Sequence, residues 1–71
     1  MKKIICIEFN AQDEHDTAEA IETAQAYRNN GFDKIILKPS SNLILDKCLN
    51  LLTFNKPKIT YLYGGLFEMI Q

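Results

Sequence analysis

The chain has 71 residues, of which 46% are hydrophobic and 24% charged, and its formal net charge is −1. This length allows a single small domain, residues 1–71, without a second core. The near-neutral charge disfavours nucleic acid or an anionic membrane as the partner, and the apolar runs are far shorter than a membrane-spanning helix. Because Glu8 interrupts the first apolar run, a signal peptide is not expected, and we predict a cytoplasmic protein.

The first predicted strand comprises residues 3–9, which are rich in β-branched and aromatic side chains. Ile5, Ile7 and Phe9 would lie on one face, and Ile4 and Cys6 on the other. A strand that is apolar on both faces is typical of one covered on both sides.

A first helix is predicted to follow, with Asp13 or Asp16 as its N-cap and an end near Asn30. Gly31 would supply the left-handed residue that stops it. Helical spacing predicts a buried stripe made of Thr17, Ala20, Ile21, Ala24 and Tyr27.

Residues 33–38 are predicted to form a second strand, ended by Pro39, which cannot donate to a ladder. The polar run 40–42 then predicts the start of a second helix, which residues 55–57 would break. The apolar face of this helix would be broad, consisting of Ile44, Leu45, Cys48, Leu49, Leu51 and Leu52.

The last strands are predicted at residues 58–63 and 66–70, joined at Gly64 and Gly65. Two glycines readily adopt the positive φ angles of a two-residue hairpin turn. With such a turn, alternation places Ile59, Tyr61, Tyr63, Leu66 and Ile70 on one face and Leu62, Phe67 and Met69 on the other.

The element order β-α-β-α-β-β predicts an α/β fold. Right-handed crossovers make the first three strands parallel and the fourth antiparallel to the third. We expect a two-layer α/β sandwich, in which two helices cover one face of a mixed four-stranded sheet that ends in a C-terminal β-hairpin. The alternative places one helix on each face, as in half of a flavodoxin-like sheet.

Two helices are too few to cover a sheet that is apolar on both faces. If Phe67 and Met69 point inward, the open face would show Ile4, Cys6, Ile36, Tyr61 and Tyr63. Apolar patches mark contact surfaces, and tyrosine is enriched at interfaces. We therefore predict a non-enzymatic protein–protein interaction module that forms a homodimer or binds another protein. So small a chain suits an accessory or inhibitor protein carried by a phage or a bacterial mobile element.

Two other functions fit particular residues. Asn10, Lys38, Ser40 and Ser41 would meet where the parallel strands end, and there they could bind a small anion or a nucleotide. No glycine-rich phosphate loop accompanies them. The third function is single-stranded nucleic-acid binding by stacking on the tyrosines, which the net charge of −1 disfavours.

Few residues of the sequence could support catalysis or bind a metal. His15 is the one histidine and adjoins Asp16, but no nucleophile is tied to it by a recognised spacing, so we expect a non-enzymatic role and leave catalysis open. Two cysteines, Cys6 and Cys48, are predicted to be free thiols. We predict neither a metal site nor a cofactor.

Overall fold

The structure is a computed structural model that describes residues 2–40, 43–54 and 59–70, and the statements below concern these residues. The elements follow the predicted order. They are β1 (Ile4–Phe9), α1 (Glu14–Asn29), β2 (Lys34–Pro39), α2 (Asp46–Phe54), β3 (Ile59–Tyr61) and β4 (Phe67–Met69).

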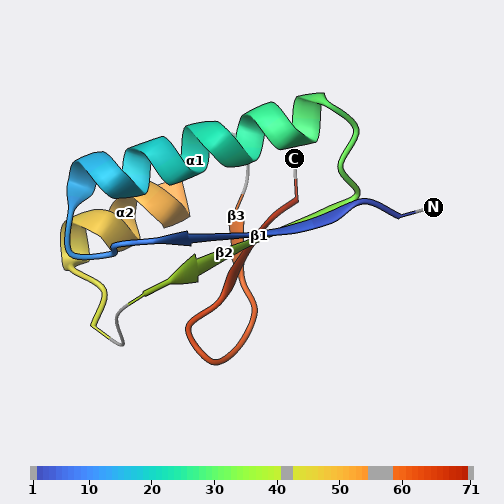
Figure 1. Cartoon of the computed structure of the whole chain (residues 1–71). Coiled ribbons are helices and arrows are strands. Elements are labelled where there is room, and N and C mark those ends of the chain that lie inside the picture. Colours follow the sequence, from blue (N-terminus) through green and yellow to red (C-terminus); the bar gives the residue numbers. More distant parts are fainter. Residues whose placement is uncertain (1, 41–42, 55–58, 71) are drawn as a thin grey trace.

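The four strands form one sheet in the order β1-β2-β4-β3 (Figure 1). β1 and β2 are parallel, and β4 is antiparallel to both β2 and β3. The first three strands therefore run in the same direction and the fourth opposes them, which confirms the predicted directions. β4 lies between β2 and β3, and the two edges of the sheet are β1 and β3.

Both helices lie on the same side of this sheet (Figure 1). α1 packs on β1, β2 and α2, and α2 contacts β3. One cluster of buried side chains joins both helices to β1, β2, β3 and β4, and its larger members are Phe9, Ile21, Ile35, Leu37, Leu52, Ile59, Phe67 and Met69. The two-layer prediction is confirmed, and the alternative with one helix on each face is wrong.

α1 begins and ends where local signals predict. The Asp13 carboxylate caps it by accepting from the backbone N–H of His15 at 2.9 Å and of Asp16 at 3.4 Å. Gly31 follows with a φ of 86°, a left-handed angle that favours glycine. The predicted stripe is confirmed: Thr17, Ala20, Ile21 and Ala24 are buried and Tyr27 is half-buried.

Arg28 joins the end of α1 to the rest of the fold. Its guanidinium donates to the carbonyl oxygens of Phe32, at 3.0 Å, and of Asp33, at 3.3 Å. It also donates to the carbonyl of Met69 in β4. One planar side chain with several fixed donors thus connects a helix, a loop and a strand.

α2 begins later than predicted, at Asp46. The Ser40 amide donates to the Phe9 carbonyl at 2.7 Å and so extends the parallel ladder beyond β2 instead of opening a helix. Cys48 and Leu52 are buried as predicted, but Leu45 and Leu49 are exposed. The rest of the predicted start, Ser41 and Asn42, and the predicted break at 55–57 lie outside the described residues.

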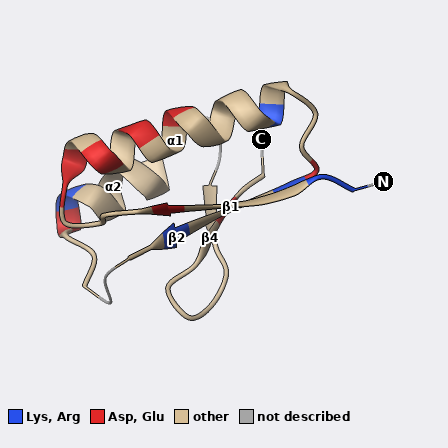
Figure 2. Cartoon of the chain, in the orientation of Figure 1, with Lys and Arg blue, Asp and Glu red and all other residues tan. Residues whose placement is uncertain are grey.

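The charged side chains are unevenly distributed. Acidic residues recur along the N-terminal half of α1, and lysines lie at the N-terminal end of β1 and along β2 (Figure 2). In the part of the chain that the structure describes, neither helix is long and apolar enough to cross a membrane.

Candidate interaction surface

The face of the sheet opposite the helices, here called the open face, carries alternate residues of each strand. On it, Ile4 lies beside Lys34, Cys6 beside Ile36, and Glu8 beside Lys38. Ile4 is 60% exposed and Cys6 is also exposed. The structure therefore brings together three of the five predicted interface residues, Ile4, Cys6 and Ile36.

Charged residues divide the apolar part of the open face. Lys34 and Lys38 flank Ile36 along β2, and Glu68 pairs with Ile36 from β4. The Lys38 ammonium lies 3.8 Å from the Glu8 carboxylate. Pressing this whole face against another apolar surface would take four charges out of water, which is costly unless every charge finds a partner. The open face is thus not a continuous apolar patch.

The hairpin contains the predicted glycine turn together with an extra residue. Gly64 and Gly65 have φ angles of 60° and 81°, as a turn of type I′ requires. The Leu66 amide donates to the Tyr63 carbonyl at 3.0 Å, whereas the Leu66 carbonyl accepts from the Leu62 amide at 2.9 Å. Two residues of one strand thus oppose one residue of the other, which is a β-bulge.

The bulge shifts the pairing by one residue, so Ile59 and Tyr61 lie on the opposite face from the one predicted, whereas Phe67 and Met69 point inward as predicted. Tyr61 lies opposite Phe67, and Ile59 opposite Met69, on the face that the helices cover. The rings of Tyr61 and Phe67 meet edge to face, with centroids 5.4 Å apart. The placement of Tyr61 beside Ile4, Cys6 and Ile36 is therefore wrong.

Tyr63 lies at the turn and is 74% exposed. It does not extend the row formed by Cys6 and Ile36, which continues through Glu68 to Thr60. The two tyrosines consequently do not lie together on the open face, so they do not form the stacking platform on which the nucleic-acid alternative depended.

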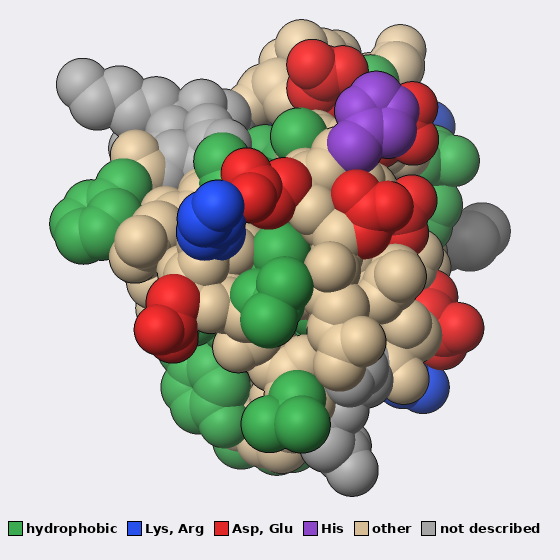
Figure 3. Space-filling view, turned by 90° about the vertical axis from the view of Figure 1, so that its left-hand side faces the viewer, with side chains coloured by type: hydrophobic (Ala, Val, Ile, Leu, Met, Phe, Trp, Pro, Cys, Tyr) green, Lys and Arg blue, Asp and Glu red, His purple; other side chains and the backbone are tan. Residues whose placement is uncertain are grey.

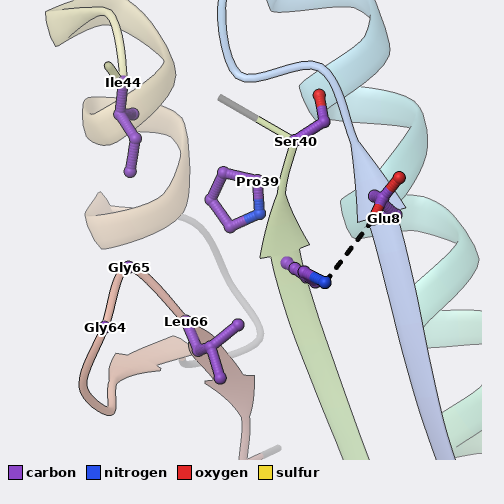
Figure 4. Close-up of a pocket in the computed structure, with 8 residues that line it drawn as sticks. Glu8, Pro39, Ser40, Ile44, Gly64, Gly65 and Leu66 are labelled. Atoms are coloured by element: carbon purple, nitrogen blue, oxygen red, sulfur yellow. Dashed lines mark ion pairs between the residues drawn. The ribbon is translucent and has the colours of Figure 1, made fainter. Parts of the chain in front are cut away.

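A groove of about 580 Å³ lies at the carboxyl end of β2, between Ile44, which precedes α2, and the hairpin turn (Figure 4). Its lining consists of Glu8, Lys38, Pro39, Ser40, Ile44, Gly64, Gly65 and Leu66. The two charged side chains in this lining have opposite signs and pair with each other. An anion would have to compete with the Glu8 carboxylate for Lys38.

The other predicted anion-binding residues do not join this groove. The Asn10 amide donates to the Asp16 carboxylate at 2.7 Å, and the Asn10 side-chain oxygen accepts from the Gln12 amide at 3.1 Å. Asn10 is therefore engaged in its own loop and does not line the groove. Ser41 lies outside the described residues. Because α2 begins at Asp46, its free amides are not at Ser40, where the prediction placed them.

Sequence reasoning missed the exposure of several apolar side chains in and before α2, namely Leu43, Leu45, Leu49 and Phe54. Viewed from the α2 end, hydrophobic side chains alternate with acidic and other polar ones (Figure 3). The late start of α2 leaves Leu45 before the helix. Leu45 and Leu49 lie at the margin of the predicted apolar face, and this position was the signal in the sequence that they could be exposed.

Titratable groups are dispersed over the described residues. The His15 imidazole lies 3.5 Å from the Glu19 carboxylate, both exposed, whereas Asp16 turns back to Asn10. Within the described ranges, no three His, Cys, Asp or Glu side chains gather in a way that could hold a metal ion. Cys6 and Cys48 are free thiols, the first exposed and the second buried.

The backbone N–H and C=O groups along the outer edge of β1 have no partner strand among the described strands. The Lys3 carbonyl accepts from the Lys34 amide at 3.2 Å, and the Phe9 carbonyl accepts from Ser40, so the odd-numbered residues of β1 bond towards β2. Backbone groups alternate in direction along a strand, so the N–H and C=O groups of Ile4, Cys6 and Glu8 point outward. Among the described strands, none pairs with this edge.

No protein-family model matches the chain, and comparisons with curated proteins and with solved structures also find no match. Function is therefore argued from the geometry of this chain alone.

Proposed function

We propose that this chain is a cytoplasmic, non-enzymatic protein-interaction module that associates with a second copy of itself. The observation that carries this proposal is the exposure of β1 on two sides. Among the described strands none pairs with its outer edge, and its open-face side chains Ile4 and Cys6 are exposed. A six-residue apolar edge strand is a template on which another strand can pair.

The partner is a second copy because the charges of β1 favour self-recognition. Lys2 and Lys3 precede the strand and Glu8 lies near its end. A strand with opposite charges at its two ends complements itself when the second copy runs antiparallel. A role as an accessory or inhibitor protein of a phage or mobile element stays a prediction from the sequence.

The test is the mass of the full chain in solution. Sedimentation velocity over a wide range of protein concentration should show a monomer that converts to a dimer as concentration rises, because association follows mass action. A sedimentation coefficient of a monomer of 8.2 kDa throughout that range would contradict the proposal.

A further inference from the structure

We infer that two copies of this chain join through antiparallel pairing of their β1 edges, with Lys2 of each copy opposite Glu8 of the other. This inference rests on the proposed self-association and specifies its surface, direction and register. The paired sheets would form one continuous eight-stranded sheet about a two-fold axis, the commonest symmetry of homodimers.

The outward-pointing backbone groups limit the registers. Lys2 lies two residues before Ile4 and continues the alternation, so Lys2, Ile4, Cys6 and Glu8 face the free edge. In an antiparallel ladder these residues must meet each other in hydrogen-bonded pairs. Three symmetric registers use at least three of these four residues, and they are centred on Ile4, on Ile5 and on Cys6.

Side-chain chemistry selects among these three registers. Centring on Ile5 places Lys2 opposite Glu8 and Ile4 opposite Cys6, each twice by symmetry. Charge then meets opposite charge, and apolar side chain meets apolar side chain. Centring on Cys6 would place Ile4 opposite Glu8, and centring on Ile4 would place Lys2 opposite Cys6. Neither pair is an ion pair or an apolar contact. The Ile5-centred register is therefore favoured.

Edge pairing is also less costly than stacking two open faces. Stacking would desolvate Lys34, Lys38 and Glu68 together with Glu8, whereas edge pairing leaves the first three side chains in water. The Glu8 carboxylate could contact Lys2 of the second copy while keeping its Lys38 neighbour, because it would lie between the two lysines along one row of the sheet.

The helix layer is compatible with this pairing. α1 lies over both β1 and β2, so strands about 4.8 Å apart would set the two copies of α1 about 10 Å apart, close to the distance of packed helices. Glu14 and Arg28 mark the side of α1 that faces α2 and β4. By helical spacing, the opposite side carries Asp16, Thr23 and Tyr27. Thr23 is small and exposed and would permit close approach.

A proline substitution tests the edge without breaking the fold. In Cys6→Pro the lost N–H is one that points outward, so the ladder between β1 and β2 is retained and only pairing with a second copy is blocked. We expect a folded monomer with the far-ultraviolet circular dichroism of the parent. A variant that folds and dimerises like the parent would overturn the inference.

Charge reversal tests the register. Lys2→Glu and Glu8→Lys should each weaken dimerisation about tenfold, since each creates two like-charged pairs in one dimer. The double variant Lys2→Glu/Glu8→Lys should recover most of the affinity. Lys34→Glu, a matched reversal on the same face but one strand further in, should leave the dissociation constant within about twofold.

The outcomes separate this inference from the proposed function. A parent that stays monomeric refutes both. A dimer whose affinity responds to none of these changes, or whose charge reversals are not mutually rescued, refutes edge pairing in this register but leaves self-association standing. Rapid formation of a Cys6–Cys6 disulfide between copies would place Cys6 opposite itself and would overturn the Ile5-centred register.

Discussion

The position of α2 can be tested with two identical substitutions one turn apart. Leu52 is fully buried in the core that both helices share, and Leu49 on the same helix is 38% exposed. Leu52→Ala should cost about 3 kcal/mol, since it removes buried methyl groups and leaves a cavity. Leu49→Ala should cost about 1 kcal/mol, because much of its side chain already contacts water. Both changes replace leucine by alanine in the same helix, so helix propensity largely cancels.

The larger loss would be a substantial part of the total stability. A chain of 71 residues is expected to have a free energy of unfolding of about 4–10 kcal/mol. Urea unfolding of both variants, followed by circular dichroism at one protein concentration, measures the two losses. Equal losses, or a larger one at Leu49, would mean that α2 is rotated from the orientation described here and would refute the assignment of its buried face.

Four further outcomes are expected. Arg28→Lys should lower the free energy of unfolding by about 1–2 kcal/mol in urea titrations, because one ammonium cannot replace the guanidinium that holds three carbonyls. Asp13→Ala should cost about 1 kcal/mol in the same assay, and Asp13→Asn, which keeps an accepting oxygen, should recover most of it. Gly65→Ala should lower the melting temperature by an amount equivalent to about 1 kcal/mol. The cause is the φ of 81° at this residue, since no atom would obstruct the added Cβ. Gly65→Asn should have a smaller effect, because asparagine tolerates this angle better than alanine. Inorganic phosphate should leave the melting temperature unchanged, since the Glu8 carboxylate occupies the Lys38 side of the groove; a rise that grows with phosphate concentration would contradict this.

The elements that could be predicted from the sequence are those whose signals are local. In α1, the cap, the buried stripe and the stop at Gly31 all lie within one segment, and all three are found. Strand directions also followed, because crossover handedness depends on the element order alone. The order of the strands did not follow from these signals, because it depends on where the hairpin inserts.

The predicted start of α2 was wrong because a tertiary hydrogen bond overrides the local sequence signal for a helix start. Ser40 has the composition of a helix start, but its amide bonds to the Phe9 carbonyl and keeps the chain in the sheet. The Leu45 amide in turn donates to the Ala11 carbonyl at 3.3 Å, which holds the segment before α2 against the loop that follows β1. Neither contact has a signature within residues 40–46, since both partners lie in a distant part of the chain.

The face assigned to Ile59 and Tyr61 was wrong because a glycine pair does not reveal the bulge beside it. In a simple two-residue turn, Ile59 would share a face with Tyr63 and not with Phe67 and Met69. The observed register instead buries Ile59, Phe67 and Met69 together beneath the helices. Burial of all three side chains therefore decides the register. The requirement that these three residues share one face was the signal from which the shifted register could have been predicted.

The composition of β1 and its position in the sheet are in conflict, and this conflict is the strongest argument for a partner. Apolar residues occupy both faces of the strand, a pattern typical of a central strand. The fold nevertheless places β1 at the edge, where the helices cover Ile5, Ile7 and Phe9 but leave Ile4 and Cys6 exposed. The core of one copy explains why Ile5, Ile7 and Phe9 are apolar, but it does not explain why Ile4 and Cys6 are. β3, the other edge, has only three residues and offers a shorter template. Pairing of β1 with a second β1 would make it a central strand of a larger sheet, with Ile4 and Cys6 beside each other across the new ladder.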